Sequence, residues 1–216
     1  MIREIGAIDV LYMAAAMRWT LLLTLLALAG GSVMGLAVAT AGASSRGWLR
    51  MGARLYVGAV QGIPLLALLF VFFFGLSVVG FSLPPLVAAT IAYSVYAGAF
   101  LGEIWRGALI AVPRTQWEAG ASIGLSYAEQ LRHVIIPQAV RLATPPSVGF
   151  LVQLIKNTSL AAVIGFVELT REGQLTTAAT FQPFWVYSIV AALYFSLCFP
   201  LTRLSRRLER TLRVAR

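Results

Sequence analysis

The chain has 216 residues, of which 59% are hydrophobic and only 12% are charged, and its net charge at pH 7 is +9. A water-soluble domain of this length needs more charge to cover its surface, and the long apolar runs indicate membrane spans. With one cysteine and one histidine, the chain has neither an internal disulfide nor a Cys/His metal cluster. The basic residues lie between and after the apolar runs, which indicates a membrane surface and no nucleic-acid partner.

Five apolar runs are long enough to cross a ~30 Å hydrocarbon core as helices. In chain order the predicted spans cover about residues 19–41, 55–79, 85–112, 143–167 and 184–204. The start of the chain lacks a basic region followed by a small-residue cleavage site, so we expect it to be retained. The sequence therefore predicts an all-α membrane protein, with residues 1–216 forming a single transmembrane domain.

Arginine placement orients these spans. The loop after the first span, the segment after the third and the C-terminal tail hold most of the arginines. Because positive residues favour the cytoplasmic side, we expect the N-terminus outside and both residues 115–137 and the C-terminus inside. Two glycine pairs, Gly31 with Gly35 and Gly98 with Gly102, have the small-xxx-small spacing that lets membrane helices approach closely.

The segment from Thr115 to Pro137 is a polar interruption in an apolar chain. Thr115 with Glu118, and Ser126 with residue 129, fit capping boxes at two helix starts. Gly124 suits the end of the first helix, and Pro137 is expected to stop or bend the second. The pattern predicts a helix-turn-helix knob that protrudes from the membrane and binds a partner, although a solvated connector has the same composition.

Several polar residues fall inside the predicted spans, where they are costly unless they face protein or water. Glu103 and Arg106 share one helix face and read either as a structural ion pair or as part of a solute path. Pro145 and Pro146 are expected to break the fourth span and free backbone groups near a cavity. The remaining candidates for the path are Gln61, Gly62, Pro64, Tyr93, Lys156, Asn157, Thr158 and Ser159.

The pattern EAG-x3-G-x9-V-x-I-P, which runs from Glu118 to Pro137, resembles the EAA motif of ATP-binding-cassette (ABC) importer permeases. The stretches QGIPLLALLF, GEIWRGAL, IIPQAVRLATPP and LIKNTSLAAVIGFVEL extend the resemblance to the polar amino-acid permeases, such as those for histidine and glutamine. The match covers roughly residues 15 to 205. It departs from the common form at Gly120 (usually Ala), at Gln61 with Ile63 (usually Arg and Thr) and at Asn157 (usually Asp).

The resemblance implies a permease subunit in a bacterial cytoplasmic (inner) membrane that imports a polar amino acid. The implied partners are two ATPase subunits that bind ATP and Mg²⁺, a second permease chain (identical or a sister) and an external or periplasmic substrate-binding protein. That protein is expected to dock against residues 81–85 and 168–183. The residues implied to couple the chain to an ATPase are Glu118, Ala119, Gly120, Gly124, Ile136 and Pro137.

The chain itself is expected to be no enzyme. It contains no GxxxxGK[ST] phosphate loop, because its sole lysine follows Ile155, and no Ser–His or metal arrangement, so no catalytic or metal-binding residue is assigned. Two alternatives differ in class: a membrane scaffold that recruits a cytoplasmic partner without transport, and a secondary transporter acting alone. The polar mid-span residues argue against the first, and the lack of apparent inverted repeats in five spans argues against the second.

Overall fold

The computed structural model describes residues 4–214, and this part of the chain contains helices and no strand. Every backbone polar group in lipid must find its partner within the segment, which is why apolar runs of this kind fold as helices. The predicted all-α class is confirmed. The α-helices are α1 Ala7–Ala43, α2 Gly47–Gln61, α3 Leu65–Phe70, α4 Leu76–Val78, α5 Pro85–Ala111, α6 Arg114–Ser122, α7 Tyr127–Glu129, α8 Ile136–Asn157, α9 Leu169–Thr180 and α10 Pro183–Val214. Two π-helical turns, η1 Val71–Gly75 and η2 Gln130–Ile135, and one 3-10 helix, η3 Thr158–Ile164, complete the helical elements.

Four helical stretches in the described residues are long and apolar enough to cross a membrane, namely residues 7–43, 85–111, 127–164 and 183–211. The third predicted span, 85–112, coincides with α5 to within one residue. The first helix begins at Ala7 and not at Trp19, and the fourth stretch begins at Tyr127 and not at Ala143, because the preceding turns continue the same helix. Hydrophobicity marks the part of a helix that suits lipid, whereas the helix itself extends further.

The second predicted span, 55–79, is broken. Helix α2 already begins at Gly47, and α2 and the α3–α4 segment meet at a bend of 99°. The bend falls at Gly62–Pro64, within the group of path candidates Gln61, Gly62 and Pro64. Pro64 has no N–H to donate and disfavours helical backbone at the preceding residue, which accounts for the break. Counted as one bent span, this pair brings the possible number of spans to five.

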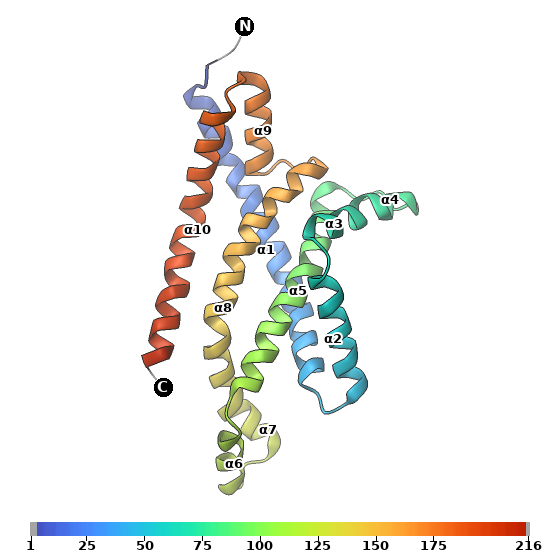
Figure 1. The fold of residues 1–216 in the computed structure, drawn as a ribbon, viewed down its shortest axis with the longest axis vertical. Coiled ribbons are helices and arrows are strands. Elements are labelled where there is room, and N and C mark those ends of the chain that lie inside the picture. Colours follow the sequence, from blue (N-terminus) through green and yellow to red (C-terminus); the bar gives the residue numbers. More distant parts are fainter. Residues whose placement is uncertain (1–3, 215–216) are drawn as a thin grey trace.

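Helices α1 and α5 form the centre of the bundle and lie against each other over much of their length (Figure 1). A Cβ added at Gly98 would lie 2.7 Å from Met34 Cβ, and one added at Gly102 would lie 2.6 Å from Val38 Cγ1. Side chains at either position would push the helices apart. The small-xxx-small pairs are therefore packing positions between α1 and α5.

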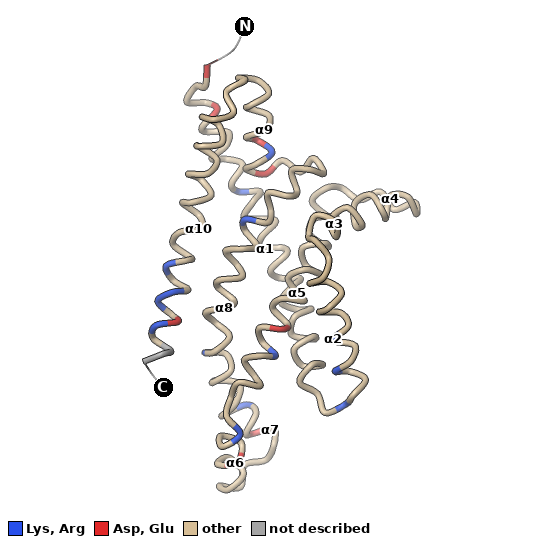
Figure 2. The backbone as a smooth tube through the Cα atoms, in the orientation of Figure 1, with Lys and Arg blue, Asp and Glu red and all other residues tan. Residues whose placement is uncertain are grey.

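The short helices α6 and α7 protrude at the end of the molecule opposite α9 and the N-terminus (Figure 1). Lys and Arg residues gather toward that end, on the lower parts of α2 and α10 and around α6 and α7, and a smaller number lie at the upper end (Figure 2). By the positive-inside rule, the end of a membrane protein that is richer in Lys and Arg faces the cytoplasm. The cytoplasmic placement of α6 and α7 stays a prediction.

Candidate functional site

The predicted knob is a compact unit built on the ends of α5 and α8. Helix α6 ends at Ser122, and Gly124 follows with φ +81°, a left-handed conformation that glycine adopts without steric cost. The ring of Trp117 stacks on that of Tyr127 with centroids 5.4 Å apart. Below the rings, Ile135 is fully buried beside Val112. The knob is therefore packed onto the ends of two long helices.

One of the two predicted capping boxes is present. Ser126 Oγ accepts a hydrogen bond from Glu129 N at 3.4 Å, and Glu129 Oε2 accepts one from Ser126 N at 2.8 Å. The box at Thr115 and Glu118 is wrong, because α6 already begins at Arg114 and Pro113 occupies the N-cap position without a side-chain hydrogen bond. Glu118 is left free of a capping role and points its carboxylate to the outside of the knob.

Of the two predicted effects of Pro137, a stop is wrong, because the second helix of the knob does not end there, and a bend stays a prediction. Helical structure runs without interruption from Tyr127 through η2 into α8, and Pro137 lies in the first turn of α8 directly after the π-helical turn. Pro145 and Pro146 likewise lie inside α8 without breaking it. The knob is therefore continuous with a candidate span.

Gly120 has a structural explanation that the sequence did not reveal. A Cβ at this position would lie 2.9 Å from Gln130 Cγ, and Gln130 is buried against α6. The Gln130 side-chain amide donates to the carbonyl oxygen of Leu125 at 2.7 Å and so closes the turn between the two helices. Glycine at 120 makes room for this side chain.

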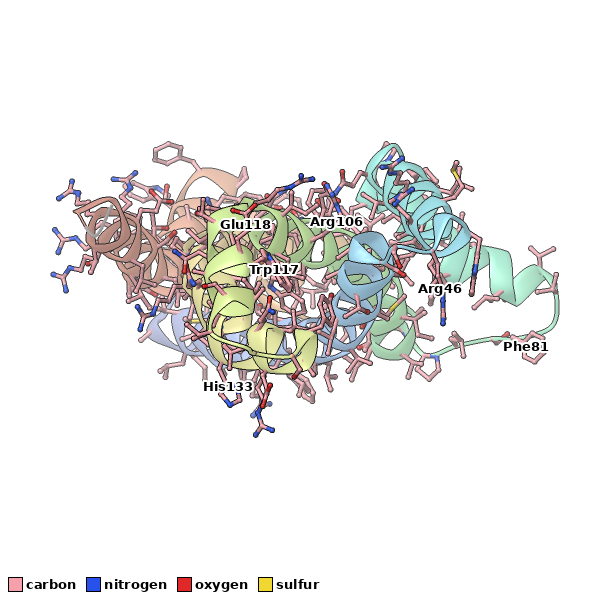
Figure 3. The ribbon with its side chains drawn as sticks, turned by 90° about the horizontal axis from the view of Figure 1, so that it is seen from below. Arg46, Phe81, Arg106, Trp117, Glu118 and His133 are labelled. Atoms are coloured by element: carbon pink, nitrogen blue, oxygen red, sulfur yellow. The ribbon has the colours of Figure 1, made fainter. Side chains whose placement is uncertain are left out.

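The other predicted coupling residues lie at the surface of the knob. Glu118, Ala119, Gly124, Ile136 and Pro137 are all exposed. Figure 3 views the knob from below, with Glu118 and His133 near opposite edges and Trp117 between them. Ile123, which sequence reasoning passed over, is 75% exposed at the tip of α6. An exposed acidic and apolar face on a rigid knob suits insertion into a groove of a partner protein.

Glu103 and Arg106 form an ion pair through both carboxylate oxygens, and Arg106 Nε donates to Glu103 Oε2 at 2.8 Å. The Arg106 side chain passes close to Gly42 at the end of α1. Both side chains are partly exposed. The structural reading of this pair thus has geometric support, whereas a role in a solute path stays a prediction.

The structure divides the polar turn at the end of α8 into exposed and internal residues. Lys156 is exposed, and its ammonium group makes no hydrogen bond or ion pair with any described residue. Thr158 is fully buried and donates to the carbonyl oxygen of Ile155 at 2.7 Å, and Ser159 donates to that of Lys156 at 2.7 Å. The hydroxyl groups therefore close the turn, and a role of Lys156 in a solute path stays a prediction.

Two tyrosines of α5 support this turn from within. Tyr93 is fully buried and donates to the backbone oxygen of Asn157 at 3.0 Å, so it braces the turn and does not line a surface. The Tyr96 hydroxyl accepts from the Gln153 amide at 3.4 Å. The exposed break at Gln61, Gly62 and Pro64 leads into α3, which contacts η3. The helices that follow the two predicted path segments thus touch, and a shared solute path stays a prediction.

Glu168 is the buried group that sequence reasoning missed as a site. It was expected in a docking surface, but its side chain is fully buried. It caps the N-terminus of α9 by accepting from the N–H of Arg171 at 3.0 Å. Burial raises the pKa of Glu168 above its usual range, against the opposing effect of its hydrogen bonds, of which that to Tyr194 is the largest. The sequence did hold a signal for this role, since an acidic residue directly before a helix can cap the helix N-terminus, as Glu168 caps α9.

Comparison with known proteins assigns this architecture. Residues 31–214 match the family described as binding-protein-dependent transport system inner membrane component. The L-cystine transport system permease protein TcyB of Bacillus subtilis is 38% identical over 195 residues, which cover 90% of this chain and 83% of that protein. The glutamine transport system permease protein GlnP of Escherichia coli K12 is 35% identical over 200 residues, 91% of each chain.

Solved structures agree. The crystal structure of an amino acid ABC transporter with histidines superposes with a TM-score of 0.88 at 30% identity and covers 97% of this chain and 100% of that chain. An inward-facing structure of the MetNI methionine ABC transporter, with a TM-score of 0.78 at 21% identity, shares the fold over 96% of this chain and 99% of its own. The chain belongs to the family of binding-protein-dependent transport system inner membrane components.

Proposed function

We propose that this chain is the transmembrane permease subunit of an ABC importer that moves a polar amino acid across the bacterial cytoplasmic membrane. Two such subunits, identical or paired with a sister chain, enclose the path. Two ATPase subunits bind ATP and Mg²⁺ on the cytoplasmic side, and a substrate-binding protein delivers the amino acid from outside. Family membership and the amino-acid permeases among the relatives support this assignment.

The observation that carries the proposal is the exposed knob fixed to two long helices. Because η2 continues into α8, and Val112 at the end of α5 packs in one cluster with Ile135 of the knob, a displacement of the knob is expected to move both helices. ATP binding closes the ATPase subunits, and α6 carries that motion into the path. In this scheme Glu118 and Ala119 contact the ATPase, whereas Gly120 preserves the internal packing of the knob.

Reversal of the charge at Glu118 tests the coupling. Glu118→Lys leaves the fold intact because the side chain is exposed, and it is expected to reduce ATP-driven uptake at least tenfold while the chain still reaches the membrane. Glu209→Lys is the matched control, since Glu209 is also exposed and lies on α10, away from the knob. Uptake in proteoliposomes and co-purification of the ATPase are measured together. Normal coupled uptake by Glu118→Lys would refute the assignment of the knob.

Substitution of Lys156 tests whether this residue lines the solute path. An exposed, unpaired ammonium group beside the η3 turn is suited to hold a substrate carboxylate, and charges inside a span mark functional sites. Lys156→Met is expected to lower uptake of radiolabelled L-glutamine or L-cystine without lowering the amount of assembled complex. Wild-type rates for both probes would remove Lys156 from the path.

A membrane scaffold that recruits a cytoplasmic partner is the rival of a different class, and a secondary transporter is a third. All three are separated by one reconstitution. The importer requires ATP and the binding protein for uptake, the secondary transporter requires neither, and the scaffold retains its ATPase partner but moves no solute.

A further inference from the structure

The carboxylate of Glu168 lies where three helices and a short connection meet. Its Oε2 accepts hydrogen bonds from the hydroxyl of Tyr194 on α10 at 2.7 Å and from that of Thr20 on α1 at 3.4 Å. Its Oε1 accepts from the backbone N–H of Arg171 on α9 at 3.0 Å. Thr20 also accepts from the N–H of Leu169 at 3.3 Å. A single buried side chain thus joins α1, α9 and α10.

Among the described residues, the groups that donate hydrogen bonds to the Glu168 carboxylate are all uncharged. The Arg171 guanidinium turns away and donates to the Gln174 side chain at 2.9 Å. The titratable groups facing Glu168 from the other elements are the hydroxyls of Tyr194 on α10 and Tyr93 on α5, and Glu172 lies one turn further along α9 itself. A buried carboxylate without a cation depends on every one of its hydrogen bonds, because each unmade bond leaves charge desolvated.

Tyr194 extends the junction to α8. Its hydroxyl bonds to Glu168 and contacts that of Thr170 at 3.0 Å. Its ring packs in two clusters at once, one that contains Met13 and Leu169 and one that contains Val152 and Ile155 of α8. Displacement of Glu168 therefore acts through Tyr194 on the helix that ends at the polar turn.

The connection from that turn to Glu168 is short and tightly held at both ends. At one end, Tyr93 holds the backbone oxygen of Asn157 at 3.0 Å. The chain then passes through η3, reverses at Gly165 with φ +84°, and reaches Glu168 three residues later. Phe166, just before the junction, meets the ring of Trp19 edge-on with centroids 6.4 Å apart. Because the connection is short and held at both ends, a displacement of α9 is expected to displace the turn at Lys156 as well.

We propose that Glu168 is a positioning residue that ties α9 to α1 and α10, so that docking on α9 shifts the Lys156–Ser159 turn. The proposal rests on the proposed function, in which the external binding protein docks near α9. Glu168 itself makes no contact with that protein, because it has no exposed surface. In this proposal the docking surface is the exposed face of α9, which includes Leu175.

The first test compares Glu168→Gln, Tyr194→Phe and the control Glu209→Gln, at an exposed position of α10 outside the docking surface, in the complete reconstituted transporter. ATP hydrolysis is measured over a titration with the external binding protein loaded with L-glutamine. Loss of a hydrogen bond to a charged group of this kind is expected to reduce the maximal stimulation about tenfold. The half-saturating concentration of binding protein stays unchanged, because the surface of α9 is intact. A structural defect instead lowers the amount of complex and leaves stimulation per complex as in wild type.

The second test is independent of transport and of the ligand. Spin labels at the exposed positions Leu175 on α9 and Val163 on η3, in a Cys198→Ala background, report the distance between α9 and the connection. Wild type and Glu209→Gln are expected to give one narrow distance distribution, and Glu168→Gln and Tyr194→Phe a broadened one.

The outcomes are distinct. A narrow distribution together with wild-type stimulation in Glu168→Gln would overturn the proposal. If Glu168→Gln does not assemble, Tyr194→Phe and Thr20→Val each remove one hydrogen bond, and wild-type behaviour of both would overturn it equally. If the binding protein does not stimulate ATP hydrolysis even in the wild-type complex, that result would count against the proposed function. The spin-label distances would then still show whether Glu168 fixes the position of α9.

Discussion

Gly120→Ala is the substitution whose effect the structure defines most closely. The new methyl group would lie 2.9 Å from Gln130 Cγ, closer than side-chain carbons approach one another. Gln130 cannot simply swing away, because it is buried and its amide closes the turn at Leu125 through a 2.7 Å hydrogen bond. Either the helices of the knob separate by a few tenths of an ångström or this bond is weakened.

Two opposing effects set the magnitude. Alanine stabilises the interior of a helix by about 1 kcal/mol relative to glycine. Overpacking of a tight site costs about 1–3 kcal/mol. The net change is therefore a loss of about 0–2 kcal/mol with Gln130 present. In a Gln130→Ala background the obstruction is gone, and the same substitution is expected to stabilise the knob by about 1 kcal/mol.

The assay is hydrogen exchange of the knob amides in the membrane-embedded protein, since local opening free energies follow from protection. The N–H of Leu125, which bonds to the oxygen of Gly120 at 3.1 Å, and that of residue 130, which bonds to Ser126 at 2.9 Å, are the reporters. A sign reversal between the two backgrounds gives a coupling energy of about 1–3 kcal/mol. Additive effects of the two substitutions would refute the packing argument.

Two further predictions concern pH and helix packing. Burial raises the pKa of Glu168 above its reference value of 4.5, so the folded chain binds more protons than the unfolded chain between those two pKa values, and stability falls as the pH rises from 4.5 through the raised pKa. Glu168→Gln is expected to flatten that slope in a pH series of thermal unfolding midpoints, and an unchanged slope would exclude this carboxyl as its source. Gly102→Leu is expected to separate α1 from α5, because a Cβ there would lie 2.6 Å from Val38 Cγ1, and to lower the amount of folded protein in the membrane. Gly107→Leu, at an exposed position with open space, is the control, and equal yields of the two variants would contradict the close packing.

Local rules succeeded where neighbours in sequence decide the structure. Ser126 and Glu129 cap each other across one turn, and Gly124 adopts the left-handed conformation expected after a helix. The break before Pro64 follows from the missing N–H of proline. The same rules failed at Thr115, because Pro113 starts the helix earlier, and they failed at Pro137 as far as a stop was expected, because the helix continues from η2 into α8.

The sequence by itself determined the membrane class, the approximate spans, the polar knob and, through the Glu118–Pro137 spacing, the family, because hydrophobic length and turn chemistry are properties of short segments. Only the tertiary structure decided which polar residues act as supports and which face outward. It buried Tyr93 and Thr158, left Lys156 exposed, and turned Glu168 from an expected docking residue into a junction of three helices. The physical reason is that burial and the hydrogen bonds between Thr20, Glu168 and Tyr194 join residues more than 20 positions apart, which no local pattern specifies.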